Sequence, residues 1–333
     1  MIGLLKWALG LVLVWLLYWA GAGWWMQNSI STWFAQQEAR GWQAEYADLQ
    51  LGGFPTRHIT TIQSPALADP ATGAAWQAER LEIDSRAIWP GHVTWRFADA
   101  PQRLSYFDQT LRLIAQDMAA DLRLHPGLAL ELEALSLSSG PWSMTEEDAP
   151  LASAQSLALS KTQTDIDQVY TIALKAEGFA PGDRLRRAAE LTETLPETFE
   201  TLELEATITW DKPWDRSALE TARPQPRHVD LRLAEAQWGA LRLLAAGDFT
   251  VDESGIPEGT ITIKAENWRD MLAIAADTGA LPANAVGPAE RTLSFLEGLG
   301  GNPNALDLRL NLRGGAVALG PVPLGPAPRL ILR

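Results

Sequence analysis

The sequence predicts a mainly β fold with a few helices (α+β) that follows an N-terminal transmembrane helix. Two observations support this prediction. A long apolar run opens the chain, and apolar and polar residues then alternate in many short segments. Each alternating segment has one apolar and one polar face, so we expect large antiparallel sheets with one apolar face. That apolar face must be covered, either by other parts of the protein or by acyl chains bound in an open, curved groove.

The composition excludes several classes of protein. The chain has 333 residues, a net charge of −14 and no Cys. Without Cys it has no disulfides, thiol nucleophile or Cys-ligated metal site. Nucleic-acid binding requires a basic face, which the acidic balance disfavours. We therefore expect no nucleic-acid partner and a fold held by burial alone.

The first element is a membrane anchor. Residues 4–26 contain one charge, Lys6, and are long enough to cross a hydrocarbon core of about 30 Å. Trp7 at one end and Trp24 and Trp25 at the other suit the membrane interfaces, whereas Trp15 and Trp19 lie between them and are not explained by this belt. Lys6 and the amino terminus precede the run, which predicts a single-pass inner-membrane protein with a cytoplasmic N-terminus and its bulk in the periplasm.

A cleaved signal sequence is the alternative interpretation of this run. Ala20-Gly21-Ala22 matches the small-residue pattern of a cleavage site. Against cleavage, the apolar run continues beyond it, and residues 28–39 extend the helix until Gly41. Both interpretations export the remainder of the chain, and we assign residues 1–40 to the anchor and its helical extension.

Residues 41–212 and 213–333 are predicted as two β-rich halves, because the Pro-containing stretch 213–226 resembles a long loop. Alternation with a period of two predicts strands in both halves. The segments are 59–62, 111–113, 128–132, 157–159, 170–174, 202–210, 229–233, 260–264 and 306–312.

Three helices are predicted between these strands. Residues 184–195 have one apolar stripe. Residues 267–277 begin with Asn267 as a cap and can end at Gly279, and residues 287–298 place Pro288 in the first turn. The last two would form a helical hairpin over residues 267–298.

No catalytic or metal-binding motif is found. The sequence lacks nucleophile-elbow, zinc-protease and phosphate-loop patterns, and its four His are far apart in sequence. The acidic run 146–148 is interpreted as a solvated loop. We assign no catalytic residue, metal ligand or cofactor.

Two local features and several short motifs remain. Residues 52–57 suit a tight corner between strands, and the Pro-rich segment 314–328 suits an edge strand or a partner-docking segment. Together with Gly41, Trp42 and Tyr46, these two features are short motifs of the chain. The order and spacing of the motifs resemble those of an alphaproteobacterial family, domain of unknown function 2125. The other positions that carry the resemblance are Gly53, Phe54, Pro55, Arg57, Trp238, Gly239, Trp268, Gly320, Pro321, Pro323, Gly325 and Pro326. The resemblance implies no catalytic residues.

More loosely, the anchor followed by amphipathic sheets is similar to AsmA-like envelope proteins, which implies lipid handling or envelope biogenesis. We expect a membrane-anchored periplasmic protein with membrane lipid or another hydrophobic ligand as partner. A non-catalytic scaffold for an envelope protein is the first alternative, and a hydrolase that uses two carboxylates is the second.

Overall fold

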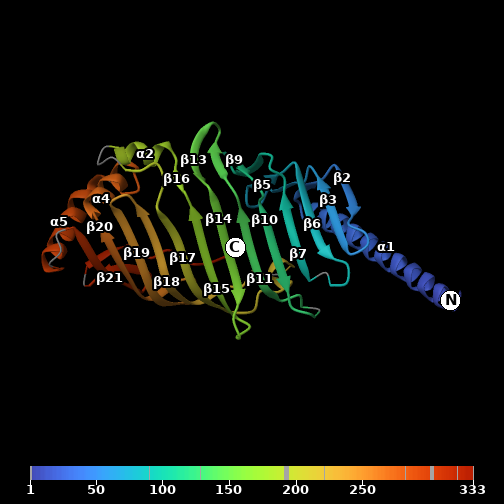
Figure 1. The fold of residues 1–333 in the computed structure, drawn as a ribbon. Coiled ribbons are helices and arrows are strands. Elements are labelled where there is room, and N and C mark those ends of the chain that lie inside the picture. The colour runs from blue at the N-terminus through green and yellow to red at the C-terminus, as the bar shows by residue number, and fades with distance from the viewer. Residues whose placement is uncertain are drawn as a thin grey trace. The chain divides into compact units, whose positions relative to one another are not determined.

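The computed structural model describes residues 2–89, 91–127, 129–190, 195–220, 222–281, 283–300, 304–320 and 322–332. The chain divides into two compact units, of which unit 1 comprises residues 1–124 and 144–147 and unit 2 comprises residues 125–143 and 148–333. The predicted boundary at residues 212 and 213 falls within unit 2. Antiparallel strands dominate both units, which confirms the predicted mainly β class (Figure 1).

Unit 1 begins with helix α1 (Ile2–Ala39), whose N-terminal part projects beyond the strands (Figure 1). The helix ends where Gly41 adopts a positive φ of 92°, as predicted. Two groups of hydrogen-bonded strands follow. One has the order β1 (Gln43–Glu45), β4 (Ala66–Asp69), β5 (Ala74–Gln77), β8 (Gln102–Tyr106) and β9 (Gln109–Ala115). The other has the order β2 (Asp48–Gly52), β3 (Arg57–Gln63), β6 (Arg80–Arg86), β7 (His92–Phe97) and β10 (Ala119–Leu124).

The core of unit 1 lies between these two sheets and the end of α1. Alternation directs one face of each sheet inward, so that Ala44 from β1 meets Ile62 and Leu81 from β3 and β6. Phe34 of α1 is 6% exposed in the same cluster. The C-terminal part of α1 is therefore part of the folded core of unit 1.

Unit 2 contains ten consecutively paired strands. Their order is β11 (Leu132–Ser139), β14 (Ser156–Gln163), β15 (Val169–Glu177), β17 (Thr201–Trp210), β18 (Pro226–Trp238), β19 (Leu241–Val251), β20 (Pro257–Glu266), β21 (Ala305–Arg313), β22 (Ala316–Leu319) and β23 (Val322–Pro326). The short strands β13 (Ala149–Ala154) and β16 (Ala180–Pro181) pair separately, and β12 (Trp142–Glu146) contributes its last residues to unit 1. The Pro-rich strand β23 is the edge of its sheet, as expected.

The helices of unit 2 are α2 (Asp183–Glu190), α3 (Ser217–Glu220), α4 (Trp268–Asp277) and α5 (Ala283–Gly300). Helices α2 and α4 pack over Trp238 and Leu241, and α4 and α5 pack over Leu306 (Figure 1). The predicted helical hairpin is thus present, although α3 was not predicted.

Several predicted details are wrong. Residues 129–131 of the predicted strand 128–132 are not in a strand, because Leu130 has a left-handed φ of 51° and β11 begins only at Leu132, while Leu128 lies outside the described residues. Pro288 lies inside α5, which begins five residues earlier. Asn267 precedes α4, but its side chain makes no capping hydrogen bond and donates instead to the Ala240 carbonyl (2.5 Å). The helix predicted for 184–195 is described up to Glu190, residues 191–194 lie outside the described part, and Leu195 is not helical.

Candidate functional site

One helix among the described residues, Leu5–Ala39, is long and apolar enough to cross a membrane or to act as a signal sequence. Its first turns carry exposed apolar side chains, including Trp7 at 78% and Leu11 at 70% exposed. Trp24 and Trp25, at the other end of the predicted span, are 66% and 65% exposed. The candidate membrane-contacting residues thus occupy the free end and the outer side of α1.

Trp15 and Trp19, which the interface belt did not explain, bind the β2–β3 turn. The Trp15 indole donates to the Pro55 carbonyl (3.1 Å), and the Trp19 indole donates to the Arg57 carbonyl (2.8 Å). The Trp19 ring also stacks on His58 and meets the edge of Phe54. Helix α1 therefore packs against the corner Gly53–Arg57, which the sequence predicts as a tight turn.

A buried ion-pair cluster lies next to this corner. The Asp84 carboxylate is 3% exposed and accepts hydrogen bonds from Arg57 Nε (2.6 Å) and Arg96 Nη1 (2.9 Å). Burial alone would raise the pKa of Asp84, but the hydrogen bonds and charges of the two arginines outweigh burial and hold the pKa below its usual value. An acid kept ionised in this way suits a structural role, because a general acid needs a raised pKa.

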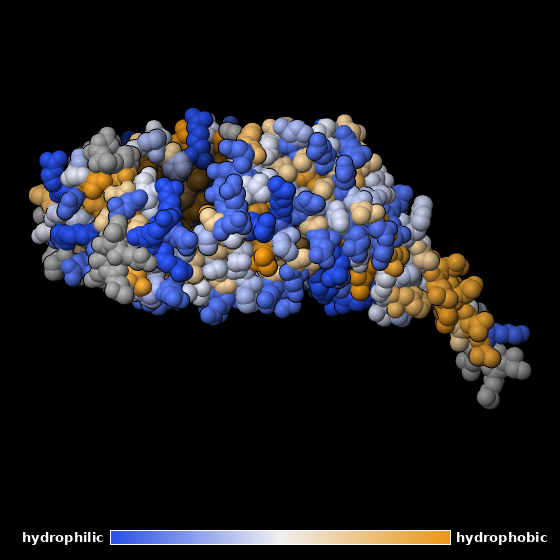
Figure 2. All heavy atoms as spheres, turned by 90° about the horizontal axis from the view of Figure 1, so that it is seen from above, coloured by the Kyte–Doolittle hydropathy of each residue, from blue (hydrophilic) through white to orange (hydrophobic). Residues whose placement is uncertain are grey.

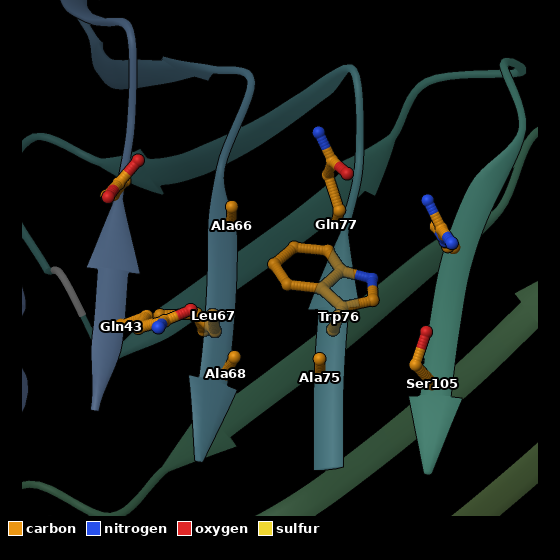
Figure 3. A pocket seen from close by; sticks show the side chains of 10 residues that line it. Gln43, Ala66, Leu67, Ala68, Ala75, Trp76, Gln77 and Ser105 are labelled. Carbon is orange, nitrogen blue, oxygen red and sulfur yellow. The ribbon is translucent and has the colours of Figure 1, made fainter. Parts of the chain in front are cut away.

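In unit 1, the outer face of the sheet that contains β1, β4, β5 and β8 has a shallow depression of about 270 Å³. Its floor includes Ala66, Ala68 and Ala75 on neighbouring strands, and Gln43 and Gln77 lie beside them (Figure 3). Small side chains create the depression because they fill less of the surface than their polar neighbours do. No group of three or more His, Asp or Glu that could hold a metal ion occurs among the described residues.

In unit 2, strand pairing aligns eight apolar residues in one row, one from each of eight neighbouring strands. We call them the apolar row: Leu137, Leu159, Leu174, Leu204, Ala234, Ala245, Ile263 and Leu308. Every member is half-buried. Within β18–β20 the row is flanked by buried clusters that contain Trp238 and Phe249, and its last member, Leu308, packs against the cluster of Trp268 and Leu306.

The opposite face of these strands is polar. Lys175 lies 3.5 Å from Glu203, Arg232 lies 3.6 Å from Glu205, and Lys264 pairs with Glu266 at 3.0 Å. Such exposed pairs add little stability but keep this face solvated. The alternation that the sequence predicts therefore separates the two faces residue by residue.

Lys161 follows Leu159 by two positions on β14 and therefore lies on the same face as the apolar row. Its cross-strand neighbours are Leu135 and Ile172. Its ammonium nitrogen lies 3.3 Å from the centroid of the Trp214 ring and 4.6 Å from that of Trp210. Burial lowers the pKa of Lys161 to about 7. Sequence patterns did not predict this site, because a lysine in an alternating strand is normally solvent-exposed.

Tyr170 completes the surroundings of Lys161, with its ring centroid 4.8 Å from the ammonium nitrogen. The Tyr170 hydroxyl donates to the Leu132 carbonyl (3.1 Å) and accepts from the Trp214 backbone N–H (3.3 Å). Burial is the main cause that raises the pKa of Tyr170 to about 12, so its hydroxyl stays protonated. Among the described residues, the buried indole N–H groups of Trp210 and Trp214 have no hydrogen-bond acceptor.

The remaining motif positions lie in unit 2. Trp238 is 4% exposed, donates to the Pro196 carbonyl (2.7 Å) and stacks on Phe199, and Gly239 has a φ of 58° in the turn that follows. Trp268 is 3% exposed and donates to Glu297.

At the C-terminal end, Gly320 and Gly325 have positive φ values of 57° and 159°, and Pro326 pairs with Ala316. Pro323 belongs to β23, and Pro321 lies outside the described residues. These positions belong to unit 2, whereas the Gly53–Arg57 corner belongs to unit 1.

Comparison with known proteins identifies a family. No curated protein matches the sequence. A family described as "Uncharacterized protein conserved in bacteria (DUF2125)" matches residues 19–328, from Trp19 in α1 to the Pro-rich end. The match covers most of the chain, and the protein therefore belongs to the DUF2125 family.

Proposed function

We propose that this protein is a membrane-anchored envelope protein that holds lipid acyl chains on the apolar face of unit 2. The apolar row is the observation that carries the proposal. It crosses eight strands, which gives a strip about 34 Å long at the usual strand spacing. Half a bilayer core measures about 15 Å, so the strip is long enough for an acyl chain.

Partial exposure supports an apolar ligand on this face. Monomeric proteins rarely leave continuous apolar strips exposed without using them for binding. A cavity of about 480 Å³ adjoins α2 and is lined by Leu151, Phe179 and Leu185 among others. Seen from above, a hollow with hydrophobic atoms in its depth opens between the positions of α2 and β13 (Figure 2).

The anchor is proposed to be retained, with the N-terminus in the cytoplasm and both units in the periplasm. Cleavage after Ala22 would remove Trp15, Tyr18 and Trp19, which bond to unit 1, and would separate them from the buried Phe34. The intact mass of the protein from membranes tests this: the full chain supports retention, and a chain that starts at Gly23 contradicts it.

Photocrosslinking tests the lipid site. Benzoyl-phenylalanine at Leu174, a member of the apolar row, is compared with the same probe at Lys175, which is on the opposite face and 54% exposed. We expect ultraviolet light to link phospholipid to position 174 and not to position 175 in membranes. Equal labelling at both positions, or none at position 174, would contradict an acyl-chain site.

The edge strand supports a second candidate function, a scaffold for a protein partner. Strand β23 lies at the end of its sheet, and its Leu324 is 53% exposed. An exposed edge can accept a strand from another chain. Leu324→Asp should abolish capture of a partner by the full-length protein if this function is correct, while leaving lipid crosslinking at position 174 intact.

A further inference from the structure

Three exposed apolar side chains occupy the tips of two hairpins in unit 1. Phe54 in the β2–β3 turn is 52% exposed, and Ile88 and Trp89 in the β6–β7 turn are 79% and 40% exposed. Both turns are fastened to α1: besides the bond from Trp15 to the β2–β3 turn, the Tyr18 hydroxyl donates to the Ala87 carbonyl (2.7 Å). The exposed tips therefore lie beside the candidate membrane helix.

The position of Trp15 within the apolar run limits where these tips can be in a membrane. The run of residues 4–26 extends eleven residues beyond Trp15, which corresponds to about 16 Å of helix. A hydrocarbon core of about 30 Å needs about 20 residues. If α1 crosses the membrane through this run, residues on both sides of Trp15 lie within the apolar layer, at the level where the hairpin tips are bound.

Basic side chains stand directly behind the tips, although the whole chain carries a net charge of −14. Arg57 is opposite Arg86 on neighbouring strands, and Arg123 of β10 lies in register with His92 of β7. Two arginines directly opposite each other destabilise a sheet unless anions lie nearby. Asp84 neutralises Arg57, whereas Arg86 and Arg123 are exposed and have no ion-pair partner among the described residues.

We propose that this edge of unit 1 docks directly on an anionic bilayer. Phe54, Ile88 and Trp89 enter the apolar layer beside α1, and Arg86 and Arg123 bind lipid phosphates at the surface. Apolar tips with a basic rim combine the two attractions that hold proteins at membrane interfaces. The proposal rests on the proposed function only in treating α1 as a membrane helix, and it does not involve the apolar row.

The absence of Cys permits a direct test with single labels. Full-length Phe54→Cys and Ile88→Cys carry an environment-sensitive fluorophore and are reconstituted in vesicles of phosphatidylcholine with phosphatidylglycerol. The matched control is Phe107→Cys, because Phe107 is 68% exposed in the β8–β9 turn of the same unit. Leu11→Cys reports separately whether α1 is in the membrane.

We expect brominated lipids to quench the labels at positions 54 and 88 at least about twofold more than the label at position 107. Equal quenching at all three positions, with strong quenching at position 11, would overturn tip insertion while leaving the anchor intact. Absence of quenching at position 11 would overturn the anchor itself and the docking proposal with it.

A second comparison tests the basic rim. Arg86→Gln combined with Arg123→Gln should reduce quenching at position 88 in the anionic vesicles to its level in pure phosphatidylcholine. Two results would overturn binding to anionic headgroups. One is unchanged quenching at position 88 in the double variant, and the other is equal quenching at position 88 in both lipid mixtures when Arg86 and Arg123 are present.

Discussion

The indole of Trp19 stacks on the imidazole of His58, with 5.0 Å between the ring centroids and 19° between the ring planes. His58 is 3% exposed, and its Nε2 donates to the Trp19 carbonyl across 3.0 Å. The carbonyl can only accept, which assigns the proton to Nε2. One residue of α1 thus binds β3 through its ring and its backbone, and the helix is joined to the folded unit rather than connected by a linker.

Replacement of Trp19 should weaken this junction. Trp19→Ala removes the stack on His58 and the hydrogen bond to the Arg57 carbonyl, so we expect the free energy of unfolding to fall by about 2 kcal/mol. Denaturation in detergent micelles measures this change. Trp24→Ala is the control, because Trp24 is 66% exposed, and it should change stability by less than about 0.5 kcal/mol. Equal losses in the two variants would refute the junction.

Gly23 permits the close approach of α1 to β2. A Cβ at this position would lie 2.3 Å from Leu51 Cδ2 and 3.4 Å from His58 Cδ2, whereas a Cβ at Gly21 would meet nothing within 4 Å. Gly23→Ile should therefore cost roughly 1–3 kcal/mol relative to Gly21→Ile through overpacking. Both variants change helix propensity equally, and melting temperatures in detergent compare them. A lower melting temperature for Gly21→Ile would reverse the expected order.

Composition and periodicity predicted the N-terminal helix, the antiparallel sheets and most of the helices of unit 2. These features depend on the local alternation of apolar and polar residues and on Gly and Pro in the turns. They did not predict that α1 packs on unit 1. Trp15 finds its acceptor at Pro55 and Trp19 at Arg57, about 40 residues away, and no local pattern encodes such a pairing. The strand predicted around Leu130 is wrong because a local pattern was present but did not decide the structure. Leu130 has a positive φ, which is incompatible with a strand despite the alternating leucines.

The candidate lipid site was predictable only in part. Alternation showed that strands such as β15 and β17 have an apolar face, but the row across eight strands depends on register, including the bulges between β17 and β18. The surroundings of Lys161 are still less local, because Trp214 comes from a loop 53 positions further along the chain. Neither relationship is visible until the strands are paired.

The Asp84 cluster gives a pH-dependent prediction. Asp84→Asn removes the charge that Arg57 and Arg96 share and should cost roughly 2 kcal/mol at pH 7. Because the pKa of Asp84 is lowered in the folded state, its stabilisation is complete above its ordinary value of 3.8. The stabilisation is then lost as the pH falls through the folded-state pKa.

Melting temperatures between pH 3 and pH 7 should therefore converge for the wild type and Asp84→Asn at the acid end. The control Glu82→Gln affects a longer pair with Arg80 at 3.5 Å, in which Glu82 is 30% and Arg80 is 46% exposed, and should change the melting temperature much less. A difference between wild type and Asp84→Asn that persists at full size below the folded-state pKa would show that the charge of Asp84 is not the cause.

Lys161 should titrate near neutrality. Burial among aromatic rings lowers its pKa to about 7 from 10.5, so the unfolded chain binds more protons than the folded protein between these values. The contribution of Lys161 to the free energy of unfolding must therefore rise with pH over that interval, and Lys161→Met should abolish the rise. Carbon-13 NMR of dimethylated lysines measures the titration directly. Lys175 is the control, because its hydrogen bond to Glu177 and the nearby Glu203 raise its pKa above 10.5. A Lys161 signal that titrates together with that of Lys175 would mean that the aromatic site is open to water and does not hold the amine in a buried state.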